Sequence, residues 1–354
     1  MTRSVLLRWR RCSGARGLPF ILGGACPASE VASGTIMVRS GQAADGSALA
    51  TVGYNNPARP QLGVETLTHS ELTSRLSLEE LSRPHRPDFH QLTLVTGGRG
   101  VAMVDFVEYP CAAGTLLHVR PGQVQRIPRP LPDGSDRRGA PDSSGVLEAA
   151  VVLFTGAFPS HLERIAPLLG HPLGPAARTV PEGERTGISH ALDELALEYR
   201  RAVEEAEAAG PTIDLLRQLL GALLLRIARL PGPDGPDEGD TGGTGGAGDD
   251  AYRRFLHELE RSFTDTRNTA DYAARIGYSP RTLNRLCQAA TGRTAKTLID
   301  ARVVLEAKRL LAHTTLPVAA IGRRLGFTEP TNFGKFFTRE TGGTPGAFRT
   351  RERG

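Results

Sequence analysis

Residues 231–250, PGPDGPDEGDTGGTGGAGDD, constrain the fold of this chain more than any other stretch. They contain only Pro, Gly, Asp, Glu, Thr and Ala. A segment without bulky apolar side chains cannot bury enough surface to offset the entropy lost on ordering. We therefore predict a flexible acidic linker that divides the 354 residues into an N-terminal and a C-terminal part.

The two parts differ in charge. Residues 251–354 contain 19 Arg or Lys and 9 Asp or Glu, whereas the whole chain has a net charge of only +5. The first 250 residues are therefore slightly acidic. A basic block of this kind indicates a polyanion as partner, nucleic acid before membrane, although a solvated basic surface explains the charge alone equally well.

The first 36 residues are rich in arginine, but their apolar stretch is short and broken by glycine and proline, which argues against a secretory signal. We expect residues 1–36 to be disordered, or Met37 to be the true start. No apolar run has the length of a membrane span. The cysteines lack CxxC or metal-ligand spacing, which indicates free thiols in a reducing cytoplasm. They are Cys12, Cys26, Cys111 and Cys287.

The N-terminal part has two patterns. From about 61 to 155, short apolar or alternating runs separated by Gly/Pro turns predict an antiparallel β-sandwich or barrel. From about 186 to 230 the period is helical, with a break at Gly210–Pro211, so we predict a two-helix hairpin. Its second helix has a wide apolar stripe of seven residues. Burial against the β-domain explains part of this stripe, and we predict that the rest pairs with a second subunit.

Two stretches of the β-region, HRPDFHQLTLV and GTLLHVRPGQVQRI, resemble the signature motifs of the cupin barrel. Metal-binding cupins have His-x-His, then Glu, in the first motif and another His in the second. Here His85 occupies the first position, Pro87 the second, Gln91 lies near the carboxylate position, and Gln125 replaces the last His. Proline cannot ligate and glutamine is a poor ligand for a transition metal, so we expect no metal, no cofactor and no enzymatic activity.

The barrel is then predicted to be a ligand pocket or a scaffold. His90 and His118 are also present, but they lack a spacing that aims them at one point. The candidate lining residues of an effector pocket are His85, Phe89, Gln91, His118 and Gln125.

The C-terminal part begins with RNTADYAARIGYSPRTLNRLCQAATG. Gly277 fits the left-handed cap that ends one helix, and Ser279 with Pro280 fits the start of the next. The spacing of Ala273, Gly277 and Leu283 is that of a helix-turn-helix unit. Any helical hairpin can show part of this pattern, but the outward face carries no acid, which favours DNA. Its residues are Arg281, Thr282, Asn284, Arg285 and Gln288.

A second unit, LPVAAIGRRLGFTEPTNFGKFFTRETG, repeats the pattern. Gly322 and Gly326 repeat the spacing of small residues, and Thr328 is the predicted N-cap of its second helix. The inward Phe333 comes seven residues after Gly326, whereas Leu283 of the first unit comes six residues after Gly277. This difference implies a longer turn in the second unit. The outward residues are Pro330, Thr331, Asn332, Gly334 and Lys335.

Residues 294–314 predict a helix between the two units, capped by Thr294. About twenty helical residues extend over about 30 Å, close to the roughly 34 Å between successive major-groove faces on one side of B-DNA. Such a connector can place two reading helices in adjacent segments of the major groove.

Residues ~251–350 resemble the DNA-binding domain of the AraC/XylS family of bacterial transcription regulators. The matching stretches are SPRTLNRLCQAATG, ARVVLEAKRLL and LGFTEPTNFGKFFTRETGGTPGAFR. More loosely, residues ~61–160 resemble the family's cupin-type effector domain, which a helical dimerisation region follows. The resemblance implies two helix-turn-helix units, each with a recognition helix in the major groove.

The resemblance also implies roles for individual residues. Arg281, Asn284 and Arg285 match base-facing positions of the first recognition helix, where arginine can pair with guanine and asparagine with adenine. Thr331, Asn332 and Lys335 match those of the second, but Gly334 replaces a side chain that often contacts DNA, which indicates weaker base readout there. Residues near helix ends are expected to contact phosphates instead. They are Arg293, Arg323 and Arg324.

The predicted fold is multidomain α and β, with a cupin-like antiparallel β-barrel, a helical dimerisation hairpin and an all-α domain with two helix-turn-helix motifs. We expect residues 1–36 to be disordered or to precede the true start, and residues 37–160 to form the effector barrel with an N-terminal arm. Residues 161–230 are expected to form the dimerisation region, 231–250 the linker and 251–354 the DNA-binding domain. Because the linker is flexible, we expect coupling between the parts to act through the geometry of the dimer.

The predicted function is that of a dimeric, sequence-specific transcription regulator in the cytoplasm, associated with the nucleoid and not with a membrane. Its expected partners are double-stranded operator DNA, a possible small-molecule effector and, for an activator, RNA polymerase. Two alternatives remain open: a metal-dependent cupin enzyme with an appended DNA-binding domain, and a non-specific architectural DNA binder.

Overall fold

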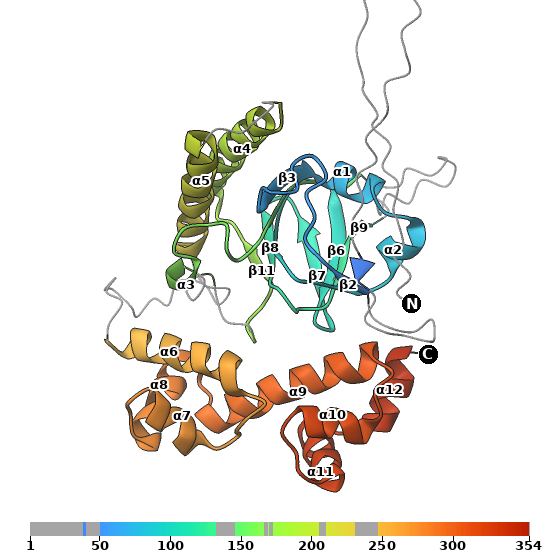
Figure 1. Ribbon diagram of the computed structural model, residues 1–354, viewed down its shortest axis with the longest axis vertical. Coiled ribbons are helices and arrows are strands. Elements are labelled where there is room, and N and C mark those ends of the chain that lie inside the picture. Colours follow the sequence, from blue (N-terminus) through green and yellow to red (C-terminus); the bar gives the residue numbers. More distant parts are fainter. Residues whose placement is uncertain are drawn as a thin grey trace, which may run out of the picture.

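The computed structural model describes residues 38–39, 50–131, 146–165, 169, 173–204, 210–230 and 247–353. A part built on β-sheets precedes a part that consists of helices (Figure 1). This confirms the predicted combination of an N-terminal β-domain with a C-terminal helical domain. The predictions for residues 1–36 and for most of the linker lie outside the described residues.

The β-domain contains two sheets. One has the strand order β1-β2-β4-β9-β6-β7 and the other β11-β8-β5-β10-β3. The strands are β1 (Val38–Arg39), β2 (Ala50–Val52), β3 (Val64–Thr68), β4 (His85–Pro87), β5 (His90–Gly97), β6 (Arg99–Val104), β7 (Val107–Ala112), β8 (Thr115–Val119), β9 (Gln125–Pro130), β10 (Glu148–Phe154) and β11 (Ala177–Thr179). The pairings are antiparallel except for β2 with β4.

Alternation along the strands decides which residues lie between the sheets. Val151 and Leu153 of β10 pack with Ile127 of β9 between the two sheets. Val152 and Phe154 point to the opposite face. In the described residues the two sheets are not joined by strand pairing, so the structure shows an open two-sheet arrangement and does not confirm a closed cupin barrel.

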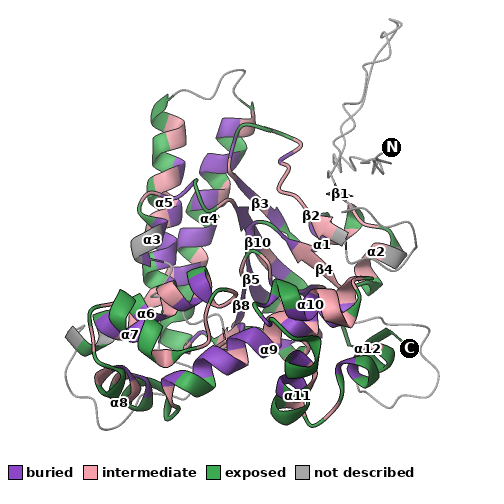
Figure 2. Cartoon of the chain, turned by 60° about the horizontal axis from the view of Figure 1, so that its bottom comes forward, coloured by how far each residue is buried: buried purple, intermediate pink, exposed green. Residues whose placement is uncertain are grey.

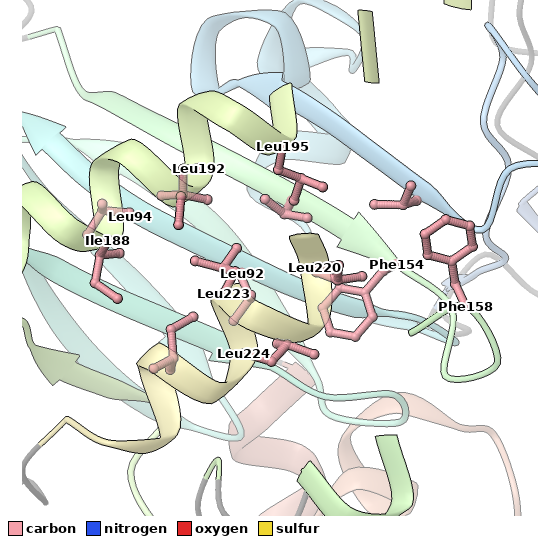
Figure 3. Packing of buried hydrophobic residues seen from close by; sticks show 14 of the residues in the cluster. Leu92, Leu94, Phe154, Phe158, Ile188, Leu192, Leu195, Leu220, Leu223 and Leu224 are labelled. Carbon is pink, nitrogen blue, oxygen red and sulfur yellow. The ribbon is translucent and has the colours of Figure 1, made fainter. Parts of the chain in front are cut away.

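Two helices, α4 (Glu182–Glu204) and α5 (Gly210–Ala228), cover the outer face of the five-stranded sheet (Figure 3). Leu220, Leu223 and Leu224 of α5 are fully buried in this cluster. Burying a leucine side chain contributes about 1.5–3 kcal/mol, so this face anchors the helix firmly. Most of the predicted apolar stripe is therefore used within the chain, whereas Leu215 remains 45% exposed.

Within the described ranges, three shorter helices complete this part, and seven helices form the C-terminal part. The former are α1 (His69–Ser74), α2 (Leu78–Ser82) and α3 (Leu162–Ile165). The latter are α6 (Ala247–Ser262), α7 (Thr269–Arg275), α8 (Pro280–Thr291), α9 (Ala295–His313), α10 (Val318–Arg324), α11 (Pro330–Thr341) and α12 (Pro345–Arg353). Because α6 begins at Ala247, the linker ends four residues before the predicted boundary.

The helical part has two hydrophobic cores that share α9. The first packs Phe255, Tyr272 and Leu283 against the beginning of α9. The second packs Phe333 and Phe337 against its later turns. The phenylalanines of the second unit are therefore structural, as predicted. Each helix-turn-helix unit has a core of its own, and one helix holds both.

Candidate nucleic-acid interface

The two helical units turn in the same way. After α7, the N–H of Tyr278 donates to the carbonyl of Ala273 at 2.8 Å, and Gly277 has a φ of 79°. After α10, the N–H of Phe327 donates to Gly322 at 3.0 Å, and Gly326 has a φ of 77°. Both are Schellman turns with glycine in the left-handed position. The predicted glycine turns are thus confirmed.

Small residues allow a close approach of neighbouring segments in the second unit. A Cβ at Gly322 would lie 3.0 Å from the Cβ of Phe333 on α11. At Gly326 a Cβ would lie 2.1 Å from the carbonyl oxygen of Thr264, closer than any side chain tolerates. At Gly277 no atom lies within 4 Å of that position. The first turn therefore needs glycine only for its backbone angle, whereas the second needs it also for space.

The recognition helices begin differently. In α8, the hydroxyl of Ser279 accepts from the N–H of Thr282 at 3.1 Å, and Pro280 is the first helical residue, as predicted. In α11 the N-cap is Glu329, which makes no side-chain cap hydrogen bond. The predicted cap at Thr328 is thus wrong, because the longer turn places Glu329 directly before Pro330 at the first helical position.

Three predicted contact residues of α8 are exposed, namely Arg281, Arg285 and Gln288. Thr282 is half-buried, and its hydroxyl lies 2.9 Å from that of Ser279. Asn284 is also half-buried, and its side-chain oxygen accepts from the N–H of Ala295 at 3.0 Å. The structure therefore gives Asn284 a role that the sequence did not predict: it connects the recognition helix to the first turn of α9.

The predicted contact residues of α11 all lie on its exposed face (Figure 2). They are Pro330, Thr331, Asn332 and Lys335. The three arginines predicted to contact phosphates are exposed as well: Arg293 after α8, and Arg323 and Arg324 at the end of α10. In the described part of the chain, no salt bridge joins any of these cations, or Arg281 and Arg285, to a carboxylate.

Helix α9 fixes the relative positions of the two recognition helices. It has 19 residues, which corresponds to about 28 Å, and the hydroxyl of Thr294 caps it by accepting from Thr297. Figure 1 shows α8 near one end of α9 and α11 towards the other, both on the side away from the sheets. The predicted capped connector is therefore confirmed.

The β-domain contacts this connector directly, which the sequence did not reveal. Arg309 of α9 donates from Nε to Oδ1 of Asp105 at 2.8 Å and from Nη2 to Oδ2 at 2.6 Å. Both side chains are buried. On β4 of the same sheet, Arg86 lies 3.5 Å from Glu306 of α9. The two parts are thus joined by ion pairs as well as by the linker.

Asp105 and Phe106 form the two-residue turn between β6 and β7, with φ of 50° and 71°. Left-handed angles at two consecutive positions match the type I′ hairpin turn, but phenylalanine adopts them at a cost of about 1–2 kcal/mol. Phe106 stacks on His313 of α9 at 5.5 Å between ring centroids and contacts Phe348 of α12 edge-on. These contacts with the helical domain offset the unfavourable angle.

The residues predicted to line an effector pocket do not share one face. Gln91 and Gln125 meet between the sheets, where Gln125 donates to Gln91 at 2.8 Å, and His85 pairs in register with Gln125. Phe89 belongs to the core between the sheets. His118 is different, because it is paired with Leu92, whose side chain points outward under α4 and α5.

His90 lies on that outer face as well, and its Nδ1 is 3.1 Å from Nε2 of His118. The interpretation that these two histidines are not brought together is therefore wrong, since strand pairing places them side by side. Burial lowers the pKa of His90 to about 4 and holds that of His118 well below its ordinary value, so both are neutral. No group of three or more His, Cys, Asp or Glu in the described ranges is placed to hold a metal ion.

Cys111 and Cys287 are buried free thiols, whereas Cys12 and Cys26 lie outside the described residues. Burial raises the pKa of Cys287 to about 12, so this thiol stays protonated. Within the described ranges, no helix combines the length and the apolar character needed to cross a bilayer.

Comparison with known proteins finds sequence similarity to the helical part. A family model described as a helix-turn-helix domain matches residues 272–351. The arabinose operon regulatory proteins of Salmonella typhimurium and Escherichia coli are each 31% identical over 80 residues, which is 23% of this chain. The match spans 28% and 27% of those proteins, little more than a quarter of their length.

Solved structures were also compared. The DNA-binding domain of AdpA, in complex with a target DNA, is 28% identical and covers 29% of this chain and 93% of that chain, with a TM-score of 0.27. ToxT from Vibrio cholerae is 8% identical and covers 81% of this chain and 98% of that chain, with a TM-score of 0.36.

Proposed function

We propose that this chain, whose C-terminal part is a helix-turn-helix domain of the AraC/XylS family, is a sequence-specific DNA-binding regulator of transcription. The observation that carries the proposal is the repetition of one Schellman turn in two units connected by the capped helix α9. Each turn presents a helix whose exposed polar side chains include cations without carboxylate partners in the described part.

In the first unit, Arg281 and Arg285 read the bases. They are one turn apart on α8 and exposed, so both guanidinium groups can reach the same groove. Arginine binds guanine O6 and N7 with two hydrogen bonds, which contributes about 1–3 kcal/mol of discrimination. Asn284 fixes the helix to α9 through Ala295, and Gln288 extends the reading face by one more turn.

The second unit positions the protein more than it reads sequence. Lys335 is the only cation on the predicted face of α11, and Gly334 offers no side chain there. In this proposal Arg323 and Arg324, in the last turn of α10, contact phosphates. Neutralising phosphates adds affinity that depends on salt but not on sequence.

A dimer is part of the proposal. Leu215 and Leu225 of α5 remain 45% and 46% exposed although the opposite face of the helix is fully buried. Pairing of this helix with its copy in a second subunit would cover them, and two copies would bind two half-sites. A small-molecule effector acting on the β-domain, and RNA polymerase for an activator, complete the set of proposed partners.

The test is in-vitro selection of bound DNA by the full-length protein, followed by binding assays on the recovered sequence. A motif with paired half-sites is the expected result, and flat enrichment would contradict sequence-specific binding. Arg285→Ala should weaken specific binding by about 1–3 kcal/mol and leave non-specific binding nearly unchanged. Arg201→Ala is the matched control, because Arg201 is an exposed arginine of α4, outside the helical part.

A further inference from the structure

A cavity of about 200 Å³ lies between the β-domain and the helical domain. It is formed by the loop after β8 on one side and by α6 and α9 on the other. The lining residues are Arg120, Pro121 and Gln123 from the loop, Glu260 from α6, and Arg302 and Arg309 from α9. Three of these six side chains are guanidinium groups, so the charges of their partners decide what the cavity can hold.

The two arginines of α9 are already paired. Arg302 donates from Nε to both carboxylate oxygens of Glu260, at 2.8 and 3.0 Å. Arg309 holds Asp105 and also lies 3.1 Å from Glu306. These contacts neutralise the helical wall of the cavity, because each of its cations has at least one carboxylate at hydrogen-bond distance.

Arg120 has no such partner. Its Nη2 donates to the carbonyl of Leu169 at 3.1 Å, and its backbone N–H donates to the side-chain oxygen of Gln123 at 2.8 Å. Its Nη1 is enclosed by the protein and has no hydrogen-bond partner in the described part of the chain. No carboxylate of the described residues forms a salt bridge with it. Arg120 is thus a cation in the wall of the cavity with no carboxylate at hydrogen-bond distance in the described part of the chain.

A second cation increases this surplus. Arg178 of β11 donates from Nη2 to the same carbonyl of Leu169 at 2.7 Å, and from Nη1 to Ile227 at 3.4 Å. Burial, together with the positive charge of Arg178, lowers the pKa of Arg120 to about 10, so the group still carries its charge at neutral pH. The carboxylates of Glu260 and Asp105 act on Arg120 in the opposite direction, but neither forms a salt bridge with it. A buried cation without a directly bound carboxylate is unfavourable unless an anion compensates it.

We propose that this cavity binds a small oxyanion, a carboxylate or phosphate group, through Arg120. A cavity of about 200 Å³ is smaller than the roughly 300–1,000 Å³ of sites for drug-sized ligands, so the ligand has few heavy atoms. Because the walls belong to both domains, the bound anion fixes the loop after β8 against α9. This inference rests on the proposed function. The anion is then a signal that acts on α9, the helix that connects α8 and α11.

The oxyanion is a free molecule and not a phosphate of the DNA backbone. The cavity is lined by the loop after β8 and by α6 and α9. Figure 1 shows α8 and α11 on the side of α9 that faces away from the sheets. The site is also distinct from the space between the two sheets, where Gln91 and Gln125 hydrogen-bond to each other. It therefore gives the β-domain a ligand position that faces the DNA-binding domain directly.

The experiment is isothermal titration calorimetry on the full-length protein, with inorganic phosphate and succinate as probes and chloride added to constant ionic strength. One saturable site is expected for at least one probe, and the probe that binds identifies phosphate or carboxylate as the chemistry. Arg120→Gln should weaken binding at least about tenfold, the effect of losing one hydrogen bond between charged groups. Arg99→Gln is the matched control, because Arg99 is an exposed arginine of the same domain, and it should bind as the wild type does.

Arg120→Lys protects the test against a folding defect of the glutamine variant. It keeps the charge but loses the planar pair of donors, so it should fold and bind more weakly than the wild type. Unchanged binding by both variants, or no saturable heat with either probe, would overturn the proposal. Binding to a selected DNA is measured separately by fluorescence anisotropy. Anion binding without sequence-specific DNA binding would refute the proposed function alone, and the converse would refute only this site.

Discussion

Replacing Asp105 with Asn tests how strongly the β-domain is attached to the helical domain. The carboxylate accepts two hydrogen bonds from Arg309, one from the N–H of Val124 at 3.0 Å, and one from Gln123 at 2.8 Å. Asn keeps the shape of the side chain and tolerates the left-handed backbone angle of this turn. Asp105→Asn therefore removes the charge and one acceptor while the hairpin can still form.

The expected loss follows from these contacts. The new NH₂ group would face the donors of Arg309 and Gln123, so the interaction on that side becomes repulsive. Breaking a buried ion pair by changing one partner costs about 3–5 kcal/mol. Glu306 remains 3.1 Å from Arg309 and still compensates part of the charge of this arginine. We therefore expect the loss in unfolding free energy to lie at the lower end of this range, about 3 kcal/mol.

Guanidinium unfolding of the full-length protein, arranged as a double-mutant cycle with Arg309→Gln, measures the coupling free energy. A coupling of about 2 kcal/mol or more is expected, since the second substitution should cost little once the first has broken the pair. Glu108→Gln is the matched control: it makes the same chemical change at an exposed position of the next strand and should stay within about 0.5 kcal/mol of the wild type. A coupling below about 0.5 kcal/mol would refute the view that this ion pair holds the domains together.

Two further predictions concern stability. Gly277→Ala should lower the free energy of unfolding by about 1–2 kcal/mol, the penalty of a left-handed residue. Gly326→Ala should lower it clearly more, because the new Cβ would lie 2.1 Å from the carbonyl oxygen of Thr264. Equal denaturation midpoints of the two variants would contradict this. Burial lowers the pKa of His85 and His90 to about 4 from an ordinary value of 6.5, so the unfolded state binds more protons between these values and stability should fall as the pH decreases from 6.5 to 4. His90→Phe should flatten that decrease, and an unchanged pH profile would show that this group does not contribute.

Local signals explain why the helical domain could be predicted closely. A glycine in the left-handed position, a serine cap and a proline in the first turn are decided by neighbouring residues, so Gly277, Ser279 and Pro280 were assigned correctly. The prediction of the cap of α11 was wrong because local sequence offers two positions before Pro330, Thr328 and Glu329. The longer turn makes Glu329 the N-cap. The periodic pattern also located α9 to within one residue at each end.

Contacts between distant residues could not be predicted. Asp105 and Arg309 are 204 positions apart, and nothing in either local pattern indicates the other. The composition of the linker predicts coupling through the dimer, but the structure shows direct ion pairs between the domains. The register of β5 with β8 likewise decided that His118 lies beside His90 and not with Gln91. Faces and partners of strands depend on pairing, which the sequence of one strand does not contain.

Because both hydrophobic cores share α9, the length of this helix sets the distance and the angle between α8 and α11. An inserted residue would advance everything beyond it by about 1.5 Å and rotate it by about 100°, because a helix has 3.6 residues per turn. One extra residue would thus turn α11 out of phase with the groove while leaving α8 correctly placed. Four extra residues would nearly restore the angle and lengthen the separation by about 6 Å. The two units are therefore fixed in their distance and angle to each other. Under the proposed function, an operator for this protein has a fixed spacing between the segments that each unit contacts.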